Sequence, residues 1–147
     1  MSIQSFINAS KLLLNEGYYQ EALCLCCSAI DAYSSKHYSN KNNNSRYKQF
    51  LKDHFRTICE IGFPGISASC IKIKVNANIE DLRPDSDGYV TMEQIIYHVL
   101  RCGLVHNCSV PEAIEFSEDT IIGDWGNRFY IPKPIILGLI ASIEEKI

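Results

Sequence analysis

The chain has 147 residues, a length typical of one domain, and at this size folding buries roughly 70% of the surface that the unfolded chain exposes. Apolar residues make up 46% and charged residues 21%, which excludes a disordered or fibrous protein. The net charge of -3 excludes a uniformly basic coat protein for nucleic acids. We therefore expect a single globular domain over residues 1–147.

The seven cysteines are an odd number, and a disulfide framework needs an even one. Residues 1–15 lack the basic start and the long apolar run of a signal peptide. No stretch approaches 18 uninterrupted apolar residues, so the sequence predicts no membrane span. We expect a cytoplasmic protein with reduced thiols and no membrane partner.

The first half of the chain predicts three helices. Apolar residues at spacings of three and four indicate a helix from Ser2, its N-cap, to about residue 15, and Gly17 is a natural stop. A second helix over residues 18–36 follows so closely that the two form an antiparallel hairpin. The polar residues 37–44 predict a loop, and a third helix is expected over residues 45–61.

The middle of the chain is less regular. Residues 63–90 predict irregular structure with a short strand over residues 71–75, where apolar residues alternate with lysines. Thr91 and Gln94 form a capping box for a fourth helix. Gly103 either ends this helix or lies inside it.

The C-terminal part predicts a small hairpin and a last helix. Residues 120–122 and 128–131 read as two strands joined by a loop longer than two residues. Pro132 and Pro134 then open a helix that runs to Ile147. The predicted fold is therefore mainly α, with about five helices and a small β-hairpin before the last one.

Charge is distributed unevenly along the chain. Residues 36–56 hold six cations and one acid and carry +5, whereas residues 80–124 hold ten acids and two cations and carry -8. A run of like charge on a helix is commonly a solvated face. The basic stretch nevertheless permits a nucleic-acid partner that the average charge disfavours.

Metal and cofactor motifs are missing from the sequence. Cys24, Cys26 and Cys27 lie within one helical turn, but no second pair of ligands accompanies them, so we interpret them as packing residues. No glycine-rich phosphate loop is present. We expect neither a metal nor a cofactor. Residues 15–23 have the character of a tetratricopeptide hairpin, although no second copy follows.

Arg101 and His106 form the one constellation with a clear chemical reading. A histidine can take or give a proton near pH 7, which cleavage of RNA by its own 2′-hydroxyl requires twice. An arginine can hold a phosphate oxygen and offset the charge of the transition state. Asn107 could bond the histidine or the phosphate, and His98 and Cys102 are supporting candidates beside the arginine.

Arg101-x4-His106 matches the R-x4-6-H motif of HEPN domains, and the string from Leu100 to His106 resembles that of uncharacterised bacterial HEPN-like proteins. The leading helical hairpin and the late motif are also similar to that family. Catalytic members often have a polar residue directly after the arginine, whereas this chain has Cys102.

The resemblance implies a metal-independent endoribonuclease that builds one cleft from two protomers, in a toxin or phage-defence setting with a neutralising partner protein. RNA would then contact the basic stretch through four cations: Arg46, Lys48, Lys52 and Arg56.

A non-catalytic alternative uses the same residues. Arg101 is also a favourable cation in the last turn of a helix, and His106 can bond a free carbonyl just beyond it. The chain would then be a HEPN-like scaffold or a tetratricopeptide-like module that binds a protein or a nucleotide. Motif side chains that face a second protomer across a cleft would favour catalysis. Side chains that point into the core of one protomer or lie on opposite sides would favour binding.

Overall fold

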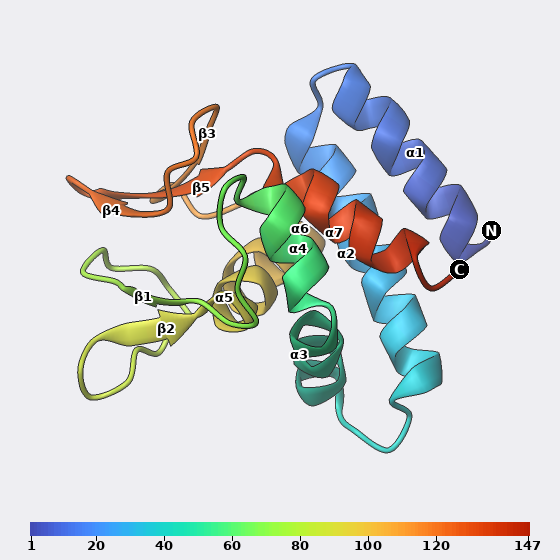
Figure 1. Cartoon of the computed structure of the whole chain (residues 1–147), viewed down its shortest axis with the longest axis horizontal. Helices are drawn as coiled ribbons and strands as arrows, with labels where there is room; N and C mark the ends of the chain where they lie inside the picture. The colour runs from blue at the N-terminus through green and yellow to red at the C-terminus, as the bar shows by residue number, and fades with distance from the viewer.

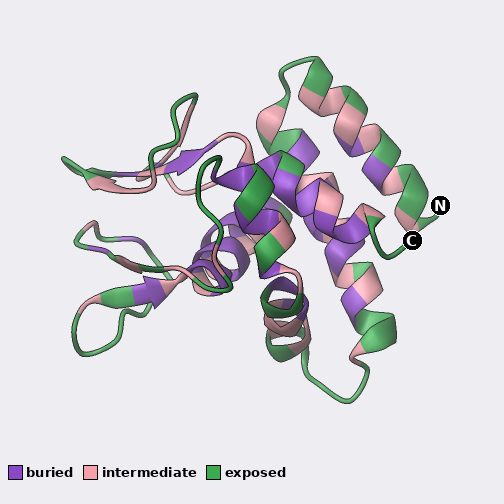
Figure 2. Cartoon of the chain, viewed as in Figure 1, coloured by how far each residue is buried: buried purple, intermediate pink, exposed green.

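The computed structural model describes all residues from Met1 to Ile147. Helices form one side of the molecule, and two small sheets lie together on the other (Figure 1). The buried residues concentrate where the helices meet, while the strands are largely exposed or half-buried (Figure 2). The prediction of a mainly α fold is confirmed.

The first two helices form the predicted pair. α1 (Ile3–Asn15) begins at Ser2, whose side chain and that of Ser5 form a capping box. Gly17 has a φ of +84°, a conformation that glycine adopts without strain, and α2 (Tyr19–His37) follows directly. The two helices lie side by side (Figure 1).

The predicted third helix is wrong in two respects. The side chain of Asn42 caps α3 (Asn43–Asp53), so part of the polar stretch begins a helix instead of forming a loop. The helix then breaks at His54, whose φ of -115° and ψ of 11° separate α3 from α4 (Phe55–Gly62). α3 packs against α2 while α4 packs against the last helix, and one straight helix could not reach both partners.

The predicted strand near residue 73 is confirmed as β1 (Lys72–Lys74). It pairs antiparallel with β2 (Tyr89–Thr91), a strand that the sequence did not predict. β2 leads directly into α5 (Met92–Gln94), and the predicted capping box of Thr91 and Gln94 is present.

The hairpin before the last helix differs from the predicted one in the position of its first strand and in the length of its turn. β4 (Gly123–Trp125) and β5 (Arg128–Pro132) pair antiparallel around residues 126–127, so the first strand lies later and the turn is shorter than expected. β3 (Ile114–Ser117) pairs parallel with β5, giving the order β3-β5-β4. The sequence did not predict β3, although Ile114 and Phe116 alternate with Glu115 and Ser117, because four residues are a minimal strand signal.

α7 (Ile135–Glu144) is the central helix of the core and is nearly as predicted. It crosses between α2 and α4 (Figure 1). A Cβ on Gly138 would lie 2.6 Å from the carbonyl oxygen of Ile58, so only glycine allows α4 this close. No helix has the length and the apolar character that crossing a membrane requires.

Candidate functional site

The motif lies on one continuous helix formed by three segments. α5 passes into a π-helix, η1 (Ile95–Arg101), and then into α6 (Cys102–Asn107). The sequence predicted a helix here but not the π-helical segment at its centre. Gly103 lies inside the helix, in α6. Such π segments are rare and are frequently found at functional sites. Four fully buried residues anchor η1 in the core: Ile95, Ile96, Val99 and Leu100.

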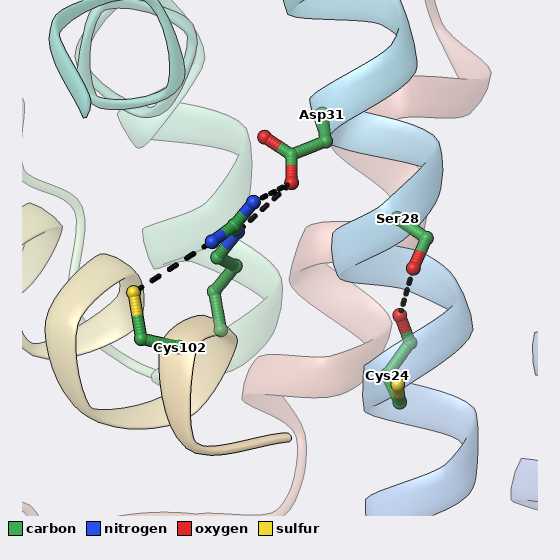
Figure 3. A network of polar contacts seen from close by, with 5 residues as sticks. Cys24, Ser28, Asp31 and Cys102 are labelled. Carbon is green, nitrogen blue, oxygen red and sulfur yellow. Dashed lines mark hydrogen bonds and ion pairs between the residues drawn. The ribbon is translucent and has the colours of Figure 1, made fainter. Parts of the chain in front are cut away.

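Arg101 is held against α2 by Asp31. The guanidinium donates to Oδ2 of Asp31 from Nε at 2.8 Å and from Nη2 at 2.5 Å, and Figure 3 shows the carboxylate facing this contact. Only 12% of the Arg101 side chain is exposed. Burial lowers the pKa of Arg101, but the hydrogen bonds and the charge of Asp31 outweigh it and raise the pKa overall.

The third nitrogen of Arg101 has a much weaker partner. Nη1 lies 3.8 Å from the sulfur of Cys102, as the dashed line in Figure 3 marks. A thiol is a weak acceptor, so this nitrogen keeps donor capacity that a carboxylate would have taken up. The side chain is therefore fixed on one edge by Asp31 and available on the other.

The structure does not bring His106 to Arg101. His106 and Asn107 are exposed at the end of α6, without a side-chain hydrogen bond. Five α-helical residues turn a side chain by about 140°. The two motif residues therefore occupy different faces within one protomer.

His98 lies in a more structured environment than His106. Its Nε2 is 2.7 Å from the ammonium nitrogen of Lys48, which comes from α3. The Lys48 ammonium also lies 5.6 Å from the ring centre of Tyr97, and the guanidinium of Arg101 lies 5.4 Å from the same centre. Both cations are within range of a cation–π interaction with one ring.

The four predicted RNA-binding cations fall into two groups. Arg46 and Lys48 are half-buried on α3, and the buried Nε of Arg46 has no hydrogen-bond partner. Lys52 and Arg56 are exposed, the first at the end of α3 and the second on α4. Lys48 is the member of this set whose side chain forms a hydrogen bond with the motif helix.

The cysteines are free, and no group of three or more potential ligands could hold a metal ion. Cys26 and Cys27 are fully buried in α2, and burial raises the pKa of the Cys27 thiol to about 12. Cys24 is half-buried. The hydroxyl of Ser28 donates a hydrogen bond to the backbone carbonyl of Cys24, one turn earlier in α2 (Figure 3). Because their thiols stay uncharged near pH 7, Cys26 and Cys27 are suited to packing in the core.

Sequence reasoning missed two residues of this arrangement, Asp31 and Tyr97. Asp31 is the only charged residue between positions 22 and 35, and an isolated charge within an apolar helix was a usable signal. Tyr97 gave no such signal, because a tyrosine next to a buried helix face is usually a packing residue.

The residues from 2 to 143 match one protein family, described as Rv1289. The chain belongs to the Rv1289 family. The match spans nearly the whole domain, from α1 to the end of α7. No curated protein and no solved structure matches this Rv1289-family chain. The family match gives no link to HEPN domains, so that resemblance stays a prediction.

Proposed function

We propose that this chain is a metal-independent endoribonuclease of HEPN type. The observation that carries the proposal is the contact between Lys48 and His98, because it joins the basic helix α3 to the motif helix. Lys48 and Arg101 both lie beside the ring of Tyr97. Tyr97 is itself buried, and two cations gathered beside its ring suit the binding of a phosphodiester.

In this proposal Arg101 binds a phosphate oxygen of the RNA. Asp31 uses Nε and Nη2, which orients the guanidinium, and Nη1 donates to the phosphate in place of the weak thiol contact. Orientation by a carboxylate limits the rotamers that substrate binding must order. Lys52 and Arg56 are exposed and extend the cationic surface along α3 and α4.

His106 transfers a proton in this proposal, and its position calls for a second protomer. Because Arg101 and His106 occupy different faces of the helix, one protomer supplies the arginine and another the histidine. Asn107, next to His106 and equally exposed, would bond the same phosphate. The homodimer, a toxin or phage-defence setting, a cytoplasmic location and a neutralising protein belong to the proposal.

The test is to incubate the purified protein with RNA in EDTA. We expect cleavage by the wild type and a loss of about 100-fold or more in His106→Ala and in Arg101→Lys, a change that keeps the charge but not the fork. Arg128→Lys is the matched control, because Arg128 is an exposed arginine on β5 far along the chain from the motif. Intact RNA with the wild type would contradict the proposal.

A non-catalytic interaction module is the second candidate. The pairing of Arg101 with Asp31 inside one protomer favours it, because this bond gives the arginine a role without any substrate. The different faces of Arg101 and His106 within one protomer favour it as well. In this case the chain binds a protein or a nucleotide and does not cleave RNA. Arg101→Lys would then alter stability or partner capture, and RNA would remain intact with the wild type and with every variant.

A further inference from the structure

Cleavage of RNA by its 2′-hydroxyl needs a group that accepts a proton close to the bound phosphate. His106 meets this need only across a dimer interface, because it lies on another face of the helix from Arg101. His98 is the imidazole that lies within one protomer beside the cations. It shares the contact at 2.7 Å with Lys48, and its ring lies 5.1 Å from that of Tyr97.

The contact with Lys48 defines the protonation state of His98. An ammonium group has three donors and no acceptor, so Nε2 of His98 must accept and must therefore carry no proton. The imidazole is neutral, and the electron pair of Nε2 accepts the hydrogen bond from the Lys48 ammonium. This is the state in which an imidazole acts as a general base.

The surrounding charges favour the same state. Burial lowers the pKa of His98, and the charges of Lys48 and Arg83 lower it further, whereas Asp81 raises it. Burial also lowers the pKa of Lys48, with Lys52 acting in the same direction and Glu93 and Cys102 opposing it.

We infer that His98, together with Lys48, forms the proton-transfer pair of this site, and that His98 contacts the 2′-hydroxyl of the RNA. The inference rests on the proposed function. It assigns to His98 and Lys48 the two proton transfers for which the motif spacing names His106. If it holds, His106 of the second protomer contacts the phosphate and transfers no proton, so His106→Gln slows cleavage less than His98→Gln does.

The reaction balances with these two side chains. Lys48 moves on its flexible stem from His98 to the leaving oxygen, which frees Nε2. The 2′-hydroxyl gives its proton to Nε2 as the O2′–P bond forms, and the P–O5′ bond breaks while O5′ takes a proton from the Lys48 ammonium. The protonated His98 then returns its proton to neutral Lys48, and both groups regain their starting states.

The first experiment measures single-turnover cleavage of RNA by His98→Gln, with His106→Gln as the matched variant. We expect His98→Gln to slow cleavage between about 100-fold and 10,000-fold, the usual contribution of a general base. Thermal unfolding checks that both variants fold. If wild type cleaves and His98→Gln keeps the wild-type rate, the inference fails while the proposed function stands.

The pH profile separates a base from a merely structural residue. The cleavage rate should fall when acid protonates His98. The acidic limb of the plot of rate against pH therefore reports the pKa of His98. Arg83→Ala removes a nearby cation and should move the limb to higher pH, and Asp81→Asn removes an anion and should move it to lower pH. Neither residue belongs to the proposed machinery. An acidic limb that neither variant moves would overturn the assignment.

A binding experiment tests, apart from cleavage, whether RNA reaches His98 and displaces Lys48. The probe is a 2′-O-methyl RNA oligonucleotide, which has no 2′-hydroxyl to react. We expect its addition to shift the imidazole NMR signals of His98 as Lys48 leaves, and to do so less in Lys48→Met. Signals of His98 that stay unchanged at saturation would overturn the inference.

Discussion

The two ends of the motif helix differ more than their separation of five residues suggests. Arg101, at the end of η1, is nearly buried and is held by two hydrogen bonds that it donates to Asp31 on α2. His106, at the end of α6, is exposed and has no side-chain partner. One end of the motif is thus fixed by tertiary structure, and the other is free to meet a substrate or a second protomer.

This difference shows what a spacing motif leaves open. The spacing places both residues on one helix, but the elements packed around the helix decide which side chain is held. α2 and α3 contact the Arg101 end and supply Asp31 and Lys48. α6 also packs against α2, and the loop after Asn107 folds back on it, but the side chain of His106 stays exposed.

Asp31→Ala should have the largest effect among changes at these two ends. It leaves the guanidinium of Arg101 mostly buried without a partner, and we expect a loss of about 3 kcal/mol in the free energy of unfolding, at the low end for a buried pair because both groups retain some exposure. His106→Ala should change it by less than about 0.5 kcal/mol. Urea denaturation measures both. Equal losses would show that the two ends are held alike.

Gly103→Ala should have an intermediate effect, at the His106 end. A Cβ at this position would lie 2.7 Å from the carbonyl oxygen of Ser109, so the loop that closes α6 must move. We expect a loss of about 2 kcal/mol in unfolding free energy. The NMR signals of His106 should change and those of Asp31 should not. A perturbation that reaches Asp31 would mean that the two ends are coupled.

The smallest effect concerns the pH dependence of stability at the Arg101 end. The pKa of His98 in the folded protein is lowered, chiefly by burial, so below about pH 6.5 the unfolded chain binds more protons than the folded one. Stability should therefore fall between pH 7.5 and pH 5.5, and His98→Gln should reduce this fall. His54 titrates in the same direction and is present in both proteins. Identical pH profiles by urea denaturation would show that His98 is solvated.

The predictable parts of the fold were those with local signals. The cap at Ser2, the turn at Gly17 and the capping box at Thr91 depend on neighbouring residues, and the structure has all three. The break at His54 and the strand β3 depend on partners distant in the sequence, so periodicity could not locate them.

The candidate site divides in the same way. The sequence predicted His98 and Cys102 as supporting residues beside Arg101, and Lys48 as an RNA contact of the basic stretch. In the structure these three side chains lie around Tyr97 or on the guanidinium. It did not predict Asp31, because an ion pair across 70 residues leaves no spacing in the sequence.

The sequence by itself determined the helical class, most helix ends and the placement of Arg101 and His106 on one helix, because caps, turns and periodicity act over a few residues. Only the tertiary structure decided which of these side chains is held and which is free. Packing of α2 and α3 against η1 places Asp31 on Arg101 and Lys48 on His98, and burial fixes both contacts.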